Sequence, residues 1–279
     1  LDVPAHVHCQ DVLHAGAAIE RLSWSGKTIL KPVYGAASRD TRIWPTLQRA
    51  VEAIRNNQTG IKNFRPEDFE IEEFVEGRLF HVDGMLHNGQ LCFAMPSLYI
   101  GDALSYANNG SPLGSVELDA DPSLIDWAFR CARALGLRNS AFHLEAIFAA
   151  RGLVFMELGA RVGAARIPEV VTLATGVPFD QSTLALHLFG EPILPMKLPG
   201  QPIGRRHGWF VYPGHHLQEK WQINGLDRFK HHPYIMRLHE AAPGQKLTTQ
   251  ISYAAEEIPL SGIVCGDSSA NLDAFLTDM

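Results

Sequence analysis

Short apolar runs, broken by glycine, asparagine or proline, set the pattern of hydrophobic and polar positions along this chain. Such runs, rich in aliphatic and aromatic side chains, predict strands. They cover residues 27–33, 69–75, 79–86, 91–100, 208–212, 235–239, 247–254 and 261–265. Breaks at Glu76-Gly77 and Asn88-Gly89 separate consecutive strands and favour antiparallel hairpins. We therefore expect a sheet built of hairpins.

Apolar residues at helical spacing predict helices between these strands. The first covers residues 44–56, and its apolar positions recur every three or four residues. Asp121-Pro122 opens a second helix, which Gly136 closes. Further helices are expected over residues 168–174, 178–189 and 268–276. The polar segment 101–115 is expected to be a long loop. Hairpin strands with interspersed helices indicate an α+β protein.

Composition and charge limit the class of protein. The chain has 279 residues, 46% of them hydrophobic, and a formal net charge of −6. This length suits one large domain or two small ones. Lys and Arg form no dense cluster, so we expect no nucleic-acid partner. No apolar run is long enough to span a bilayer and no signal pattern opens the sequence, so we expect no membrane partner and a cytoplasmic location.

The cysteines and prolines add little about function. Cys9, Cys92, Cys131 and Cys265 lie far apart and form no CxxC or Cys/His cluster, so we expect buried thiols in a reducing compartment. Prolines at 192, 195, 199 and 202 predict a linker and a boundary near residue 195. The chain starts with Leu and a strand pattern follows almost at once, so we expect an upstream part to be missing.

The segment 141–161, AFHLEAIFAARGLVFMELGAR, carries the main clue to function. It predicts two apolar strands, each with one carboxylate. A loop over 150–152, with Gly152 in a left-handed conformation, would place Glu145 directly opposite Glu157. Like charges in that position repel unless a proton or a cation lies between them. Two carboxylates without His or Cys suit Mg²⁺, which often also binds substrate phosphates. The alternative is that both glutamates lie on a solvated face.

Arg161 strengthens the metal hypothesis. It follows Glu157 in the motif ELGAR, between Gly159 and Gly163, which leave room for a ligand. A planar guanidinium at this place would neutralise a transferring phosphoryl group. The alternative is an ordinary loop arginine beside turn glycines.

Two segments of the first third suggest nucleotide binding. Lys31 lies inside an apolar strand, where an ammonium group is costly unless it meets an anion or water. The loop from Gly35 to Ser38 is suited to fold over phosphates, and a plain turn is its alternative. The strand end 72–77, EEFVEG, suits recognition of an adenine edge, or else carries solvated acids. The absence of GxxxxGK[ST] and GxGxxG patterns argues against a P-loop or Rossmann site.

In this order, the motifs resemble those of the ATP-grasp superfamily, specifically carboxylate–amine ligases such as the L-amino-acid ligases. LKPVYGAAS is similar to the family's lysine strand and glycine loop, EEFVEG to its adenine hinge, and HLEAIF with GLVFMELGARVGAARIPEVV to its metal-binding core. The resemblance implies two antiparallel-sheet α+β subdomains that clamp ATP, over 1–75 and 76–194, and a small C-terminal α+β closing subdomain over 195–279. The family's N-terminal α/β domain is expected to be absent from this chain.

The resemblance also implies roles for individual residues. Three would bind or cover the nucleotide phosphates, namely Lys31, Gly35 and Ser38. Three would border the adenine, namely Glu72, Phe74 and Val75. Glu145 and Glu157 would hold Mg²⁺, with Mn²⁺ as an alternative ion. Arg161 would act with Glu157 on the transferring phosphoryl group.

Two positions depart from the family pattern. Many members have Asn where this chain has Gly159, which leaves fewer ligands for a second metal ion. Many members also have a ribose-binding Glu where this chain has Leu79, and Glu76 is the expected substitute. A further phosphate-binding lysine, usual before the first strand seen here, is not visible in the sequence.

The function implied by the resemblance is an ATP-dependent carbon–nitrogen ligase. It would form an amide or peptide bond through an acyl phosphate and release ADP and phosphate. Expected substrates are small-molecule carboxylates and amines, amino acids in particular, and a homodimer is left open. The alternative is a nucleotide-binding pseudoenzyme, or a subunit that requires a partner domain. A third hypothesis is a purely structural α+β protein.

Other polar residues are weaker candidates for the site. His143 shares a strand face with Glu145 and is a candidate partner for it. His81 is a candidate to face the nucleotide. A substrate carboxylate has three candidate partners in Arg166, Arg205 and Arg206.

Overall fold

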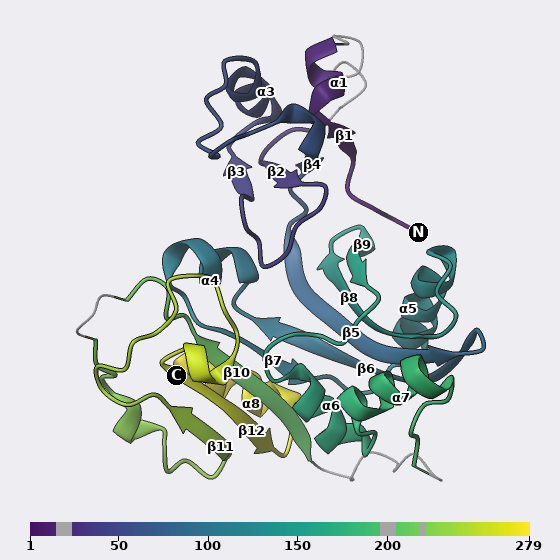
Figure 1. Ribbon diagram of the computed structural model, residues 1–279, viewed down its shortest axis with the longest axis vertical. Helices are drawn as coiled ribbons and strands as arrows, with labels where there is room; N and C mark the ends of the chain where they lie inside the picture. The colour runs from purple at the N-terminus through teal and green to yellow at the C-terminus, as the bar shows by residue number, and fades with distance from the viewer. Residues whose placement is uncertain (15–23, 196–204, 218–220) are drawn as a thin grey trace. The chain divides into compact units, whose positions relative to one another are not determined.

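The computed structural model describes residues 1–14, 24–195, 205–217 and 221–279 (Figure 1). The chain divides into two compact units. Unit 1 contains residues 1–77 and 147–155, and unit 2 contains residues 78–146 and 156–279. Each unit has a hydrophobic core of its own. Within the described ranges, no helix is long and apolar enough to cross a membrane.

Unit 1 is built on a four-stranded sheet in the order β1-β4-β2-β3. Its strands are β1 (His6–His8), β2 (Thr28–Pro32), β3 (Arg42–Trp44) and β4 (Phe69–Glu73), and they pair antiparallel. Its helices within the described residues are α1 (Cys9–His14), α3 (Leu47–Arg55) and the 3₁₀ turn η1 (Pro66–Asp68). Leu30 and Ile71 are fully buried at the centre of its core.

A side-chain cap sets the start of α3. The hydroxyl of Thr46 accepts a hydrogen bond from Arg49 N at 3.2 Å, which satisfies one of the free N–H groups of the first turn. The sequence pattern placed the helix start too early, at residue 44. Trp44 instead pairs with Thr28 at the end of β3.

Unit 2 contains most of an eight-stranded sheet in the order β11-β12-β10-β7-β6-β5-β8-β9. Its strands are β5 (Gly77–His87), β6 (Gln90–Ile100), β7 (Leu113–Glu117), β8 (Ser140–Ala149), β9 (Gly152–Gly159), β10 (Arg206–Tyr212), β11 (Ile235–Glu240) and β12 (Leu260–Gly266). The described helices of this unit are α4 (Ala103–Asn109), α5 (Pro122–Ala134), α6 (Ile167–Thr175), α7 (Phe179–Phe189) and α8 (Ser269–Asp278), with the 3₁₀ turns η2 (Leu226–Arg228) and η3 (Ala255–Glu257). The tip of the β8–β9 hairpin, residues 147–155, belongs to unit 1.

One face of the large sheet carries a row of buried polar side chains. Residues paired across antiparallel strands project to the same face. Tyr99 of β6 pairs with Ser115 of β7, and Ser115 pairs with Trp209 of β10. The register of β5 with β6 places His81 and Asp83 on this face as well. The polar row therefore shares its face with large apolar residues.

Helices α6 and α7 supply the other half of the core on that face (Figure 1). Val171 and Phe179 of these helices belong to one buried cluster with Met95 and Trp209 of the sheet. Burial of each side chain of this size contributes about 1.5–3 kcal/mol. The polar row therefore lies in a packed interior, where each polar group needs a partner.

The segment 101–115, expected to be a loop, contains helix α4 and the start of β7. The carboxylate of Asp102 caps the helix by accepting a hydrogen bond from Ser105 N at 2.7 Å. Gly110 ends the helix in the left-handed conformation, with φ 74°. The expectation was wrong because a seven-residue helix is defined mainly by its caps rather than by a long apolar stripe.

The strand expected over 247–254 is also wrong, because the structure has an irregular segment there. Ile251 and Tyr253 pack against the core without joining the sheet, and the ring of Tyr253 lies 4.9 Å from that of Tyr106 in α4. Alternating apolar residues satisfied by packing alone give the same sequence pattern as a strand. The other predicted strands and helices are present, with ends shifted by a few residues.

The proline-rich stretch lies partly outside the described residues. Pro192 and Pro195 follow α7 in irregular chain, whereas Pro199 and Pro202 fall in the segment 196–204, which is not described. Downstream of it, β10 and β12 join the large sheet of unit 2. The division of the chain into three parts at residues 75 and 195 stays a prediction.

Gly77 provides a test of how closely the backbone of unit 1 is packed. A Cβ atom there would lie 2.3 Å from Phe148 O and 2.5 Å from Ile147 Cγ2. We expect Gly77→Ala to lower the free energy of unfolding by about 1–3 kcal/mol through overpacking. Gly35→Ala is the matched control, because its Cβ would make only ordinary contacts at 3.4 Å and beyond, and we expect at most about 1 kcal/mol in either direction. Equal stabilities of the two variants in urea unfolding would contradict this packing.

Candidate active site

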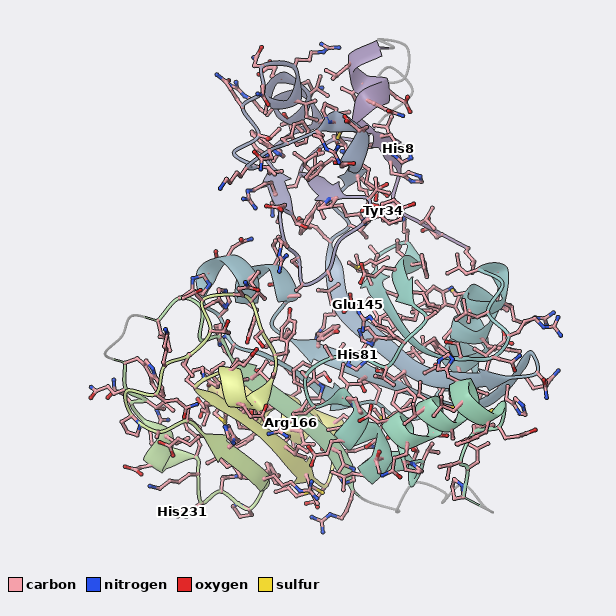
Figure 2. All side chains as sticks on the ribbon, in the orientation of Figure 1. His8, Tyr34, His81, Glu145, Arg166 and His231 are labelled. Carbon is pink, nitrogen blue, oxygen red and sulfur yellow. The ribbon has the colours of Figure 1, made fainter. Side chains whose placement is uncertain are left out.

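Glu145 is a half-buried residue of β8 with two polar neighbours (Figure 2). Tyr99 of β6 donates its O–H to Glu145 Oε1 at 2.5 Å, and His143 Nε2 lies 3.5 Å from the same oxygen. These neighbours do not use Oε2. Burial raises the pKa of Glu145, but the hydrogen bond and charge of His143, together with Tyr99, outweigh burial and lower that pKa to about 2. Glu145 is therefore ionised at neutral pH.

A fully buried carboxylate, Asp83 of β5, holds His143 from its other side. His143 Nδ1 lies 3.0 Å from Asp83 Oδ1, and His81 Nδ1 lies 2.6 Å from Asp83 Oδ2. His81 Nε2 lies 2.9 Å from Ser115 Oγ. Neither His81 nor Asp83 has any exposed side-chain surface. We call this connected set the Asp83 network, and its members are Ser115, His81, Asp83, His143, Glu145 and Tyr99.

Donor and acceptor roles assign the protons of the Asp83 network. An ionised carboxylate only accepts, so Asp83 accepts N–H from Nδ1 of both histidines. His143 Nε2 faces the carboxylate of Glu145, so this nitrogen also carries a proton and the ring is an imidazolium. Burial lowers the pKa of His143, but the charge and hydrogen bond of Asp83, with those of Glu145, raise it to about 10. Burial likewise raises the pKa of Asp83, and the two histidines lower it well below its ordinary value.

Glu157 lies on β9, in the same hairpin as Glu145, and is exposed. Gly152 is the first residue of β9 and has φ 116°, a positive value of the kind expected for it. The direct facing of Glu145 and Glu157 across the hairpin stays a prediction.

Arg161, just beyond β9, folds its side chain back over Gly159. Its Nη1 donates to Val162 O at 2.8 Å. A Cβ atom at position 159 would lie 3.2 Å from both Cγ and Nε of Arg161. Glycine at this position therefore makes room for the arginine.

Lys31 and Glu72, both expected at the nucleotide, contact each other in unit 1. Lys31 of β2 places Nζ 2.9 Å from Glu72 Oε1 and 3.8 Å from Glu70 Oε1, both on β4. The anion that this strand lysine meets in the structure is thus a carboxylate pair. Burial raises the pKa of Glu72 above its ordinary value, although the charge of Lys31 lowers it. Contact between Lys31 and phosphate stays a prediction.

The other expected nucleotide residues lie in two connecting segments of unit 1. Gly35 and Ser38 belong to the turns between β2 and β3, where Ser38 has φ 54°. Phe74, Val75 and Glu76 connect β4 to β5. Lys27 Nζ lies 5.1 Å from the centroid of the Phe74 ring. The backbone N–H of Phe74 donates a hydrogen bond to Lys27 O at 3.1 Å. Binding of adenine by this segment stays a prediction.

The arginines considered for a substrate carboxylate are engaged with the protein itself. Arg166 precedes α6, with Nη1 3.3 Å from Glu169 Oε2 and Nη2 3.2 Å from Ser261 Oγ (Figure 2). Arg205 and Arg206 contact a buried thiol and a surface carboxylate, respectively. Nothing in these contacts selects one of them for a substrate.

Sequence reasoning missed Asp83, Tyr99 and Ser115. It noted His143 beside Glu145, and the structure has this contact. A signal for Asp83 was present, because His81 and Asp83 alternate with apolar residues in a strand and so share one face. The partners on β6 and β7 depend on the register of separate strands, which no local pattern gives.

Comparison with known proteins identifies the fold. No protein-family model matches the chain. The L-amino acid ligase from Bacillus licheniformis matches in structure with a TM-score of 0.70 at 18% identity, over 100% of this chain and 66% of that chain. The chain has the ATP-grasp fold. This confirms the α+β class with antiparallel sheets and the resemblance drawn from the motifs.

Two further matches fit this fold. The biotin carboxylase domain of Hydrogenobacter thermophilus 2-oxoglutarate carboxylase, solved with MgADP, has a TM-score of 0.64 at 15% identity, over 96% of this chain and 59% of that chain. In sequence, the chain is 25% identical over 156 residues to Dapdiamide A synthase of Enterobacter agglomerans, a match that covers 53% of this chain and 36% of the relative. The chain thus spans less than two thirds of these proteins.

The charge pairing of Lys31 on β2 is testable. We expect Lys31→Met to lower the free energy of unfolding by about 1–3 kcal/mol at neutral pH, because it leaves Glu72 buried without its cation. Loss of the lysine raises the folded-state pKa of Glu72 further above its unfolded value. A raised carboxyl pKa costs stability at high pH, so the deficit should shrink as the pH falls towards the ordinary glutamate value.

The control is Arg65→Met, which removes the exposed partner of Asp68 in the same unit and should cost less than about 1 kcal/mol. Urea unfolding at several pH values measures both variants. A Lys31→Met deficit that equals that of Arg65→Met, or that does not change with pH, would contradict the pairing.

Proposed function

We propose that this chain is an ATP-dependent carboxylate–amine ligase that forms an amide or peptide bond. A substrate carboxylate would attack the γ-phosphoryl group of ATP and give an acyl phosphate and ADP. An amine would then displace phosphate and lose a proton. Similarity to an L-amino acid ligase and to Dapdiamide A synthase supports amino acids as the first substrates to examine.

One observation carries this proposal. Within an ATP-grasp fold, a single hairpin bears the ionised carboxylate of Glu145 and the exposed carboxylate of Glu157, and a guanidinium follows at Arg161. Two acids and an arginine in this order supply oxygen ligands for a cation and positive charge for a phosphoryl group. A structural role alone gives no reason for such a set.

The residues present fit a hard divalent cation such as Mg²⁺. Glu145 is ionised, and Tyr99 and His143 fix one of its oxygens while leaving the other unused by them. Carboxylate oxygens are preferred ligands of Mg²⁺ and Mn²⁺. When bound, the ion supplies charge neutralisation for the triphosphate.

The chain's own residues would do the remaining work by positioning and charge. Arg161 would stabilise the negative charge of the transferring group, since its side chain is exposed and follows Glu157 by four residues. Lys31 would contact phosphate by sharing or leaving the carboxylate of Glu72. The loop from Gly35 to Ser38 would exclude water, which otherwise hydrolyses an acyl phosphate.

Binding without catalysis is the competing proposal, and Leu79 favours it. Many ATP-grasp members carry a ribose-binding Glu at that position, and Glu76 is the substitute proposed here. A nucleotide-binding pseudoenzyme, or a subunit completed by a partner domain, would bind ATP without consuming it.

Oxygen labelling distinguishes these proposals. Pairs of amino acids with ¹⁸O in the carboxylate are incubated with ATP and Mg²⁺, and ADP and phosphate are analysed. We expect ADP formation that depends on the amino acids, with one label in each phosphate, because the attacking oxygen leaves with phosphate. Unlabelled phosphate would contradict the acyl phosphate. Tight ATP binding without turnover would support binding alone.

Glu157 is the position at which the metal assignment is tested by substitution. We expect Glu157→Gln to reduce ADP formation on the order of a hundredfold or more, since it removes one anionic ligand. Stability should change by less than about 1 kcal/mol, because the side chain is exposed.

The control is Glu191→Gln, which alters another exposed glutamate of unit 2 and should leave ADP formation unchanged. Retained activity in Glu157→Gln would remove the metal assignment.

A further inference from the structure

The burial of the charged Asp83 costs free energy of folding, and the proposed site does not explain why this charge is there. Asp83 is a carboxylate with no exposed surface, on a sheet face shared with Met95 and Trp209. A buried charge costs several kcal/mol unless it is paired, and an apolar residue of similar size would avoid that cost. Asp83 is paired with two histidines, so the question is what those pairs do.

The two carboxylate oxygens of Asp83 contact different histidines, which continue to different parts of the sheet. Through Oδ1 Asp83 binds His143, whose other nitrogen faces Glu145. Through Oδ2 it binds His81, whose other nitrogen faces Ser115, away from Glu145. The contact through His143 therefore ends on the candidate metal ligand, whereas the contact through His81 ends on β7, which lies beyond β6 on the other side of β5 from Glu145.

We propose that Asp83 is a positioning residue for Glu145 and acts through His143, an inference that rests on the proposed function. The contact between Asp83 and His143 Nδ1 fixes the rotation of the ring and so aims Nε2 at Oε1 of Glu145. Tyr99 holds the same oxygen. The carboxylate of Glu145 is thereby held in one orientation, with Oε2 directed elsewhere. A ligand fixed before the cation arrives loses less conformational freedom on binding.

The backbone also holds Asp83 in place. A Cβ atom at Gly163 would lie 2.8 Å from Asp83 Oδ1, so the segment before α6 closes directly onto the carboxylate. Glycine is therefore required at this position of the ATP-grasp core by the close approach, whatever its φ. Both Gly163 and His143 thus hold Asp83 Oδ1, the oxygen through which Asp83 acts on Glu145.

A metal ion at the histidines themselves is the competing explanation. His81, Asp83 and His143 each offer one ligand atom, and these atoms lie within 4.8 Å of one another. However, each histidine contacts a different oxygen of Asp83, at 2.6 and 3.0 Å, as two separate hydrogen bonds do. Hydrogen bonding accounts for the whole arrangement without an ion.

The test measures metal binding directly, with Mn²⁺ as the probe. The wild-type chain and its variants are titrated with Mn²⁺ in the presence of a non-hydrolysable ATP analogue, and free Mn²⁺ is followed by electron paramagnetic resonance. We expect Asp83→Asn to weaken Mn²⁺ binding about tenfold or more, the usual effect of removing a group that orients a metal ligand. Ser115→Ala, which removes a buried hydrogen bond at the far end of the network, should change it less than about twofold.

Thermal unfolding reports whether each variant is folded. Where Asp83→Asn does not fold, His143→Asn replaces it, because it keeps a polar group near Asp83 and removes the nitrogen that faces Glu145, and the same loss is expected. Equal effects of Asp83→Asn and Ser115→Ala, or none from either, would overturn this inference and leave the proposed function standing. A transition metal bound stoichiometrically to the purified protein at the histidines would also overturn it. Wild type that binds no Mn²⁺ with the analogue would overturn both.

Discussion

The pairing of a buried carboxylate with two histidines organises the polar interior of unit 2. Asp83 lies where the sheet packs against α6 and α7, so its charge has no access to water. The imidazolium of His143 compensates for this and places a second charge beside Glu145. Because Glu145 is ionised by these neighbours, the edge of the buried network presents an oxygen ligand to whatever binds there. Fold stability and proposed chemistry thus depend on the same charges.

Unit 1 follows a similar principle with a simpler pair. Lys31 lies between Leu30 and Pro32 in β2, and two glutamates of β4 lie close to its ammonium group. The ion pair of Lys31 and Glu72 avoids the desolvation cost of an unpaired charge on either side chain. If Lys31 binds nucleotide, its ammonium group must contact a phosphate instead of, or in addition to, these carboxylates. In the proposed nucleotide site, the carboxylate of Glu72 and a phosphate would therefore compete for Lys31.

The sequence predicted those parts of the molecule that depend on local pattern. The hairpin of Glu145 and Glu157 was visible because glycine marked its turn and each strand carried one acid. Helix α4 was missed because its signal lay in the capping residues Asp102 and Gly110 rather than in periodicity. The segment containing Tyr253 was read as a strand because packing against the core produces the same alternation.

What escaped prediction in the site is its long-range pairing. Asp83 and His143 are sixty residues apart, and their contact depends on the order of strands in the sheet. Lys31 was correctly expected to need an anion, but its carboxylate partners lie on β4, a strand that is not adjacent in the sequence. The local sequence shows that a side chain such as Lys31 needs a partner of opposite charge. Which residue supplies that partner depends on how the strands pair in the fold.

The most direct measurement is a crystal structure with Mn²⁺ and a non-hydrolysable ATP analogue, in which anomalous scattering locates the metal. The account predicts a Mn²⁺ peak within coordinating distance of both Glu145 and Glu157 and of the analogue's phosphates. Mn²⁺ and phosphates bound away from these two carboxylates, or nucleotide bound with no metal at the hairpin, would contradict it.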